Sequence, residues 1–491
     1  GVSITLSDIY SIRTALNVVD GLKLSINGNF VTAVCLFILF MFISVKVIHV
    51  KDKYERRPTF AKNITIVLGV IGLVAICAPD YFTNDVQLWN INNAYADSGA
   101  GLTLIRMVKE FNVNKPKKYS VDETKKILAK YEDDVDSVED TSDLPNVLVI
   151  MNESFADLAM SYNMELSDDP LEFYHELITR DNVVSGVMHS SQFGGGTANV
   201  EYECITQNAT AFLPSGAMPY QQYISGKIKQ SMVAYMNRLG YTTYGIHSWE
   251  KSGYSREKVY KFLGFNHSFF KEDMNNLQFM RNGYSSDQST YEVYYNVMNN
   301  KPDGDKNFSF IVTMQNHLPY NDVDPNAIQF LNDNNDVISY LQSEYLADRA
   351  LKNLIDYLSE YKEDVIVLFF GDHQPNLNQK DLYSLTGNYG ENSASQVVPF
   401  FIWANYNIEK KDNIDTSANY LESLLLDAAN MPKDSYTKYI EDLRSELPVI
   451  TNHYYIGNDG DLYEIDDNSS PYFDKLQEYW KVIYYNMFDN K

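Results

Sequence analysis

Five short, continuous apolar runs follow one another after Pro145, and they constrain the fold more than any other feature of the sequence. The runs are NVLVIMNES, YTTYGIHS, FSFIVTMQNH, DVIVLFFGDH and VVPFFIWAN. Apolar runs without polar alternation are typical of strands that are covered on both faces. Segments with helical periodicity, such as IKQSMVAYMNRLG and VISYLQSEYLADRALKNLIDYLSEY, separate several of them. The sequence therefore predicts an α/β fold with a mainly parallel sheet between helices.

Polar residues stand where three of these predicted strands end. They are Glu153 after the first run, His317 after a later one, and the pair Asp372 and His373 after another. Ligands of parallel sheets bind at the carboxyl ends of the strands. Glu153, Asp372 and His373 offer oxygen and nitrogen ligands that suit one divalent ion, Mn²⁺, Mg²⁺ or Zn²⁺. Taken alone, Asp372 and His373 could form a turn with a hydrogen-bonded histidine, and Glu153 could cap a helix. Because all three residues follow strand ends, a metal site is favoured.

The segment FGGGTANVEYE places three consecutive glycines immediately before Thr197. Glycine permits backbone conformations and close approaches that other residues forbid. The residues that follow can begin a helix whose free amides face an anion. A hydroxyl at that point could bind a metal, lose its proton and attack phosphorus. Spacing alone leaves open a mobile surface loop in which Thr197 merely caps the helix.

The first eighty residues have a different composition from the rest. Residues 30–45 and 64–79 are nearly uncharged and apolar on every face, and we predict two transmembrane helices within 30–80. A buried helical hairpin in a soluble protein is the alternative. The loop between them holds six basic and two acidic residues, which places it in the cytoplasm and the residues after Pro79 outside. Residues 1–29 are expected to be an outer-surface loop with an amphipathic helix, in a fragment that lacks upstream spans.

Charge and capping signals divide the residues after Asp80 into two parts. Residues 81–145 are predicted to be a helical connector, in which Ser120 and Glu123 form a capping box before a charged helix, and residues 146–491 the extracellular catalytic domain. The chain has 65 acidic and 40 basic residues, and the acidic excess lies after residue 79. Such a surface excludes nucleic-acid binding, which requires a basic face. A phosphate substrate must therefore be held by local groups.

Five separated motifs also resemble a known family. They are NVLVIMNESF, GGGTANVEYE, HSWEKSGYSREKVYKFLGF, MQNHLPY and FFGDHQP, in this order between Asn146 and Asn405. They resemble the extracellular sulfatase-like domain of the lipoteichoic acid synthase family, glycerophosphotransferases of the alkaline phosphatase superfamily. The predicted upstream spans are similar to the N-terminal membrane half of that family. The resemblance implies a multi-pass protein of the cell membrane, in a Gram-positive type of bacterium, with its catalytic domain outside.

The resemblance also implies roles for individual residues. Thr197 stands where the family has its nucleophile, and with Glu153, Asp372 and His373 it would bind a single metal ion, usually Mn²⁺. The residues matched to glycerophosphate binding are His247, Tyr254, Arg256 and His317, of which His317 is the expected proton carrier. Trp249 and Tyr254 depart from the family, which has an aspartate and a tryptophan at these positions. These departures affect substrate detail and acceptor choice more than the phosphoryl chemistry.

The function implied is transfer of glycerol phosphate from phosphatidylglycerol, through a phosphothreonine, to a teichoic-acid-type chain, a glycolipid primer or a cell-wall polysaccharide. The alternative is another head-group transferase or phosphodiesterase of the superfamily, similar to phosphoethanolamine transferases. Those domains usually contain several disulfides, whereas Cys204 is the only cysteine after residue 79. A sulfatase is less favoured, because no Cys or Ser in a C/S-x-P-x-R context lies near Thr197. The non-enzymatic alternative is a membrane-anchored binding protein, which would form no covalent adduct with its ligand.

Overall fold

The structure is a computed structural model. It describes residues 98, 103, 113–135, 138, 141–162, 166–214, 216–224, 226, 228, 230–330, 334–377 and 396–489. The helix expected within residues 1–29 and the two spans predicted at 30–45 and 64–79 lie outside these residues. No helix in the described part of the chain combines the length and the apolar character that crossing a membrane requires. Nearly all described residues belong to one compact unit that includes Val113–Lys491.

An eight-stranded sheet forms the centre of this unit, with the strands in the order β4-β3-β5-β1-β6-β7-β2-β8. Seven strands run parallel, and β7 alone is antiparallel to its neighbours β6 and β2. The mainly parallel α/β sheet predicted from the sequence is therefore confirmed, and all five apolar runs form strands. The strands are β1 (Asn146–Asn152), β2 (Val183–His189), β3 (Thr242–His247), β4 (His267–Phe270), β5 (Asn307–Val312), β6 (Val365–Gly371), β7 (Val397–Ala404) and β8 (Lys411–Ser417).

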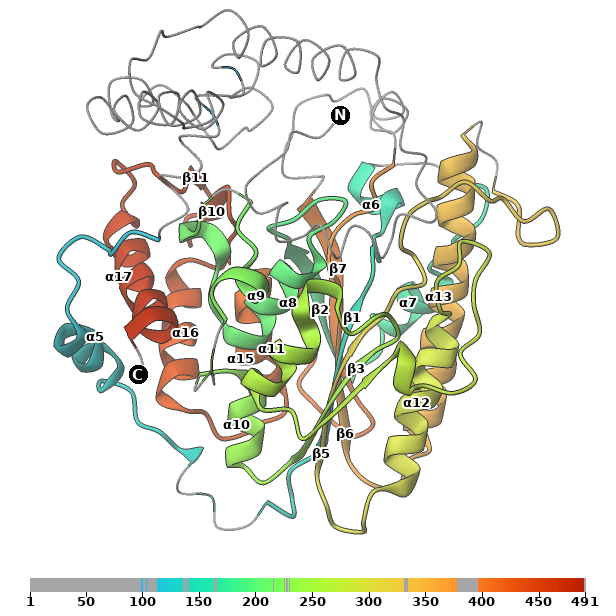
Figure 1. The fold of residues 1–491 in the computed structure, drawn as a ribbon, viewed down its shortest axis with the longest axis horizontal. Helices are drawn as coiled ribbons and strands as arrows, with labels where there is room; N and C mark the ends of the chain where they lie inside the picture. The colour runs from blue at the N-terminus through green and yellow to red at the C-terminus, as the bar shows by residue number, and fades with distance from the viewer. Residues whose placement is uncertain are drawn as a thin grey trace, which may run out of the picture. The chain divides into compact units, whose positions relative to one another are not determined.

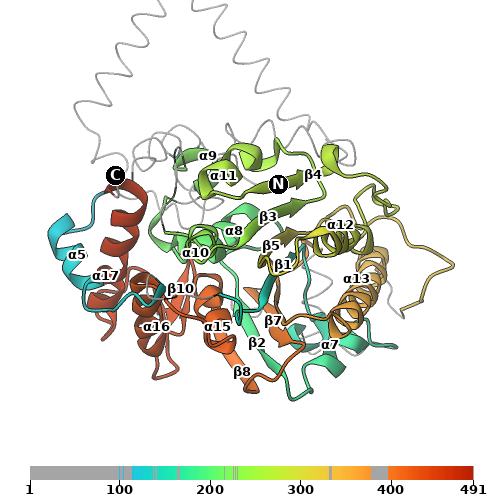
Figure 2. The same cartoon turned by 90° about the horizontal axis from the view of Figure 1, so that it is seen from below.

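Helices cover both faces of the sheet (Figures 1 and 2). Alternate residues of β1 enter different cores, because successive side chains of a strand point to opposite faces: Leu148 and Ile150 pack in one, Val147 and Val149 in the other. The first core is completed by α7 (Glu172–Leu177), α12 (Asp287–Asn300) and α13 (Asn335–Ser359). The second is completed by α8 (Thr197–Thr206), α10 (Met232–Arg238), α11 (Arg256–Leu263) and α15 (Leu421–Ala428). All ten residues of α8 are buried.

A third core lies beside the sheet and contains the end of the chain. It brings together α5 (Val121–Leu128), α16 (Ser435–Glu446) and α17 (Phe473–Tyr484) with a small antiparallel sheet of β9 (Val449–Ile450), β10 (Tyr454–Ile456) and β11 (Leu462–Glu464). The predicted capping residue Ser120 precedes α5, and its Oγ accepts a hydrogen bond from the Glu123 amide at 3.4 Å. The connector helix thus packs on the same compact unit as the sheet. The remaining short helices are α6 (Leu158–Tyr162) and α9 (Pro219–Gln222), with single turns at Thr210–Phe212, Gly253–Ser255, Lys271–Asp273, Ala418–Tyr420 and Tyr485–Asp489.

Four neighbouring parallel strands, β3, β5, β1 and β6, bring the predicted site residues to one edge of the sheet. Their final residues are in register, with His247 opposite Val312 and Asn152 opposite Gly371. Glu153 directly follows β1, and Asp372 directly follows β6. Side chains from segments far apart in the sequence are therefore neighbours at this edge.

Candidate active site

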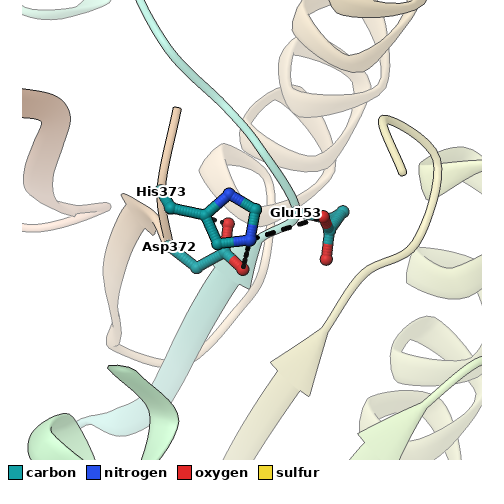
Figure 3. Close-up of side chains that lie close together, drawn as sticks. All are labelled: Glu153, Asp372 and His373. Atoms are coloured by element: carbon teal, nitrogen blue, oxygen red, sulfur yellow. Dashed lines mark hydrogen bonds and ion pairs between the residues drawn. The ribbon is translucent and has the colours of Figure 1, made fainter. Parts of the chain in front are cut away.

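Glu153, Asp372 and His373 form a buried cluster at the ends of β1 and β6 (Figure 3). One ligand atom from each residue lies within 4.8 Å of the others. The Nε2 atom of His373 is 3.2 Å from Asp372 Oδ2 and 3.8 Å from Glu153 Oε1. The cluster is thus small enough for the three residues to hold one ion between them.

Hydrogen bonds fix one side of Asp372 and one side of His373, and they leave the other side of each group turned toward the cluster. Asp372 Oδ1 accepts bonds from the amides of Ser154, at 2.7 Å, and His373, at 2.8 Å. His373 Nδ1 donates to the carbonyl of Gln374 at 3.0 Å, so that Nε2 carries the lone pair of the neutral ring. Within the described residues, Asp372 Oδ2 and His373 Nε2 have no hydrogen-bond partner. Buried polar atoms without partners are costly, and a bound cation would satisfy both of these.

The electrostatics of the cluster also fit a cation. Burial, together with the neighbouring Glu153 carboxylate, raises the pKa of Asp372 to about 6. Burial would lower the pKa of His373, but Asp372 and Glu153 outweigh it and raise this pKa above its usual value. Two carboxylates this close repel each other unless a positive charge lies between them. Two oxygen ligands and one imidazole suit Mn²⁺, Mg²⁺ or Zn²⁺, and the ligand set alone does not select among them.

Thr197 is the first residue of α8, and its Oγ1 donates a hydrogen bond to Glu153 Oε2 at 3.2 Å. The three preceding glycines all have positive φ, between 62° and 150°. Two of them pack closely on their surroundings: the Gly194 amide donates to the Gln374 carbonyl at 3.1 Å, and a Cβ at Gly196 would lie 2.2 Å from Gln192 Oε1. The segment is therefore a packed turn that carries the hydroxyl to the cluster, in contrast to the mobile loop that spacing alone left open.

Arg256 and His247, two of the predicted substrate contacts, are buried and touch each other. Arg256 Nη1 donates to His247 Nε2 at 3.2 Å, and His247 Nδ1 donates to the Val312 carbonyl at 3.1 Å. Burial and the Arg256 charge hold the pKa of His247 well below its usual value, so that the ring is neutral. The family resemblance implies that His247 contacts glycerophosphate, whereas here both ring nitrogens bind protein atoms. The ring of Tyr254, the third predicted contact, lies 5.2 Å from the Arg256 guanidinium carbon.

Glu201 is a site residue that the sequence did not identify. Its Oε2 accepts a hydrogen bond from Arg256 Nε at 2.9 Å. The only signal was its spacing, four residues after Thr197, which places both on one face of a helix.

His317 lies after β5 in a row of aromatic rings. Its ring centre is 4.6 Å from that of Tyr284, which in turn is 4.7 Å from Trp249. The Nδ1 atom of His317 donates to the Leu318 carbonyl at 2.7 Å, which leaves Nε2 as the basic nitrogen of the neutral ring. Lys271 Nζ lies 4.0 Å from the centre of the Trp249 ring. No hydrogen bond joins His317 and Thr197 among the described residues, and Tyr284 and Lys271 had no distinguishing signal in the sequence.

Comparison with known proteins matches residues 145–431 to the sulfatase family. The chain belongs to this family. Among curated relatives, a putative cyclic beta-1,2-glucan modification protein of Rhizobium meliloti is 30% identical over 392 residues, which are 76% of this chain and 59% of the relative. Lipoteichoic acid synthase 1 of Bacillus subtilis is 22% identical over 283 residues, which are 52% of this chain and 41% of the relative. The resemblance to lipoteichoic acid synthases is confirmed, and the sulfatase-family chain spans less than two thirds of the length of these relatives.

Solved structures share the fold of this sulfatase-family chain. The phosphoglycerol transferase GacH of Streptococcus pyogenes, solved in complex with sn-glycerol-1-phosphate, has a TM-score of 0.64 at 22% identity, over 77% of this chain and 96% of that one. The lipoteichoic acid synthase LtaP of Listeria monocytogenes has a TM-score of 0.53 at 15% identity, over 75% and 98%. The fold is therefore that of sulfatase-like proteins of the alkaline phosphatase superfamily.

Proposed function

We propose that the protein is a membrane-anchored, metal-dependent glycerophosphotransferase that uses phosphatidylglycerol as its donor at the outer surface of the membrane. The observation that carries this proposal is the Thr197 hydroxyl, hydrogen-bonded to Glu153 at the start of α8 and beside the cluster of Asp372 and His373. A nucleophile, a set of metal ligands and a helix N-terminus at one point suit phosphoryl transfer.

The residues of the site divide the work on the phosphate. Glu153, Thr197, Asp372 and His373 would hold one divalent ion such as Mn²⁺, which when bound lowers the pKa of a ligand hydroxyl and compensates phosphate charge. Arg256 is the residue we assign to the phosphate oxygens, because guanidinium N–H groups match their geometry. His247 holds Arg256 through its neutral ring, and Tyr254 lies beside the guanidinium group.

Transfer proceeds in two balanced steps. Thr197 Oγ1 forms a bond to phosphorus, the bond between phosphorus and the diacylglycerol oxygen breaks, and diacylglycerol leaves with a proton. An acceptor hydroxyl then attacks phosphorus, the bond to Thr197 breaks, and Thr197 regains a proton. Nε2 of His317 is the group we assign to take the proton of the acceptor. Anchoring in the membrane would raise the effective concentration of a lipid donor.

The acceptor is a hydroxyl of a cell-envelope polymer or glycolipid, and we favour a polysaccharide. Two relatives support this choice by their names, the putative glucan modification protein and a capsular polysaccharide biosynthesis protein of Rhizobium meliloti, 29% identical over 140 residues, 28% of this chain and 25% of the relative. A growing polyglycerophosphate chain and a lipid primer are the other acceptors to test.

Phosphatidylglycerol labelled in its head group tests the proposal. The full chain is incubated with this lipid and Mn²⁺, and diacylglycerol release and label on the protein are measured. We expect Thr197→Ala to lose both, with a rate at least about 10³-fold lower, as for other removed nucleophiles. Thr206→Ala, at the buried end of the same helix, is the control and should keep both.

Three outcomes would contradict the proposal. Equal diacylglycerol release by Thr197→Ala and the wild type would exclude Thr197 as the nucleophile. Transfer of label to water alone, with every candidate acceptor supplied, would show a hydrolase. Turnover of labelled phosphatidylethanolamine in place of phosphatidylglycerol would favour the phosphoethanolamine transferase alternative.

A further inference from the structure

A buried ion pair connects the helix that carries Thr197 to the arginine of the site. Glu201, one turn after Thr197 on α8, and Arg256, at the start of α11, are 0% and 2% exposed. Glu201 Oε2 lies 2.9 Å from Arg256 Nε and 2.8 Å from Nη2. The other oxygen of Glu201 accepts a hydrogen bond from the Tyr260 hydroxyl at 2.8 Å. The carboxylate is thus fully engaged inside the protein.

This pair changes what Arg256 offers to a ligand. Its charge is already compensated by Glu201, and the ring of His247 on its other side is neutral. Nε and Nη2 face Glu201, and Nη1 donates to His247. A guanidinium group has five N–H donors, so these contacts leave one N–H on each of Nη1 and Nη2. The guanidinium group therefore presents an N–H donor for a phosphate oxygen while adding no net positive charge.

We propose that Glu201 makes the site selective for phosphodiesters over phosphomonoesters. A phosphodiester carries one negative charge, whereas a monoester carries almost two above its second pKa of about 6. An unpaired arginine would favour the dianion, and the buried Glu201 carboxylate removes that preference by repelling the second charge. The inference rests on the proposed role of Arg256 as a phosphate ligand. Its consequence is that a phosphodiester head group binds more tightly than free glycerol phosphate.

Binding of two small ligands tests this selectivity without any turnover. Glycerol phosphate serves as the monoester and glycerophosphoglycerol as the diester, and the Kd of each is measured by calorimetry at pH 8 with Mn²⁺ present and the full chain. We expect the wild type to bind the diester more tightly. Glu201→Gln keeps the size of the side chain but removes its charge, and it should shift the ratio of the two Kd values toward the monoester by about tenfold or more.

Matched variants separate charge from geometry. Glu203→Gln changes a carboxylate of the same buried helix that binds Ser191 and Thr210 instead of Arg256, and it should leave the ratio unchanged. Tyr260→Phe removes the other hydrogen bond to Glu201, while the charges of Glu201 and Arg256 remain. This variant should also leave the ratio of the two Kd values unchanged. The double variant Glu201→Gln/Arg256→Gln has the wild-type net charge and should return the ratio of the two Kd values toward its wild-type value. It leaves no unpaired buried charge, so it can be measured even if Glu201→Gln alone does not fold.

The proposal is overturned if Glu201→Gln raises the Kd of both ligands by the same factor, because Glu201 would then only position Arg256. An unchanged ratio, or a wild type that binds neither ligand, would overturn it as well. The outcome is separable from that of the proposed function. A shifted ratio in a protein that does not consume phosphatidylglycerol would refute the donor alone, and phosphatidylglycerol turnover with an unshifted ratio would refute the selectivity alone.

Discussion

Gly194 shows how little space separates the turn before Thr197 from the loop after β6. A Cβ at this position would lie 2.6 Å from Asn376 Cβ, closer than two carbon atoms can approach. We expect Gly194→Ala to push the two segments apart, to lower the free energy of unfolding by about 1–3 kcal/mol, and to reduce diacylglycerol release because Thr197 moves away from Glu153. Gly226→Ala, which meets nothing within 4 Å, is the control for chemical denaturation and activity. Equal activity of the two variants would contradict this role of the turn.

Individual site residues were predictable to different degrees. Glu153, Asp372 and His373 were identifiable because they directly follow apolar strands, and strand ends converge in a parallel sheet. Thr197 stood out through its glycines and the family motif. Glu201 could not be paired with Arg256, because the contact joins residues 55 positions apart through the packing of α8 against α11. Local sequence patterns do not encode such a pairing.

His175 should make stability depend on pH, although it lies outside the active site. Its Nε2 is 2.9 Å from Asp157 and its Nδ1 is 2.7 Å from Asp169. The hydrogen bond to Asp157, with further help from Asp169 and against the effect of burial, raises the pKa of His175 to about 9. Because the folded pKa exceeds the unfolded value of about 6.5, this stabilisation is complete below pH 6.5 and is lost as the pH rises through about 9.

The corresponding measurement compares His175→Gln with the wild type by thermal unfolding. At pH 6 we expect the variant to be less stable by about 1 kcal/mol, the upper range for a pair that solvent partly screens. The difference should nearly vanish at pH 10. His267→Gln, at an exposed position on β4, is the control. A pH-independent difference for His175→Gln would mean that packing, and not its charge, stabilises the fold.

At the level of elements, α13 forms hydrogen bonds to both of the segments that follow β1 and β5. The buried Glu344 of this helix accepts hydrogen bonds from the Ala156 amide, at 3.0 Å, and from Asn316 Nδ2, at 2.7 Å. These partners follow Glu153 and precede His317 in the chain. Burial raises the pKa of Glu344 well above its usual value. The hydrogen bonds from Ala156 and Asn316 offset part of the cost of burying this carboxyl group.

We expect Glu344→Ala to lower the free energy of unfolding by about 2–4 kcal/mol, because two buried donors would lose their acceptor. Leu346→Ala, at a position of the same helix that is 43% exposed, should cost far less. Urea denaturation of both variants measures the difference. Similar stabilities would show that water or a rearranged loop replaces the Glu344 contacts.

The elements themselves were partly predictable. The five strands found from the sequence are largely buried, and β1, β5 and β6 are buried along their whole length. Three strands were missed. Two of them, β4 and β8, lie at the edges of the sheet, and β8 has the polar sequence KDNIDTS. The third, β2, lies between β7 and β8, and Ser185 and Gly186 interrupt its apolar sequence VVSGVMH. The direction of β7 was also unpredictable, because an apolar run looks the same in a parallel and an antiparallel strand.

At the level of the whole molecule, the third core supports the active site from the far end of α8. The buried Tyr479 hydroxyl of α17 donates to the Gln207 carbonyl at 2.7 Å and accepts from the Ala209 amide at 2.9 Å. Gln207 is the capping residue that follows α8, and Thr197 is the first residue of the helix. A helix that is held at one end by the C-terminal segment thus positions the nucleophile at the other.

Tyr479→Phe tests this connection. We expect it to lower the free energy of unfolding by about 1–3 kcal/mol, since a buried carbonyl and a buried amide would lose their partner. Tyr463→Phe, whose hydroxyl binds Asp459 at the surface, is the matched control. Unfolding by denaturant checks stability, and hydrogen exchange of the α8 amides checks that the loosening reaches the helix. Unchanged exchange would mean that α8 is held independently of the third core.

The complete burial of α8 has a practical consequence for altering this protein by directed evolution. A helix without a solvent face has few positions that tolerate random substitution, so libraries that include it would contain many destabilised variants. Trp249, Tyr254 and Lys271 are only partly buried and lie beside the site. Searches for variants that accept a new polymer should therefore diversify these three positions and leave α8 as it is.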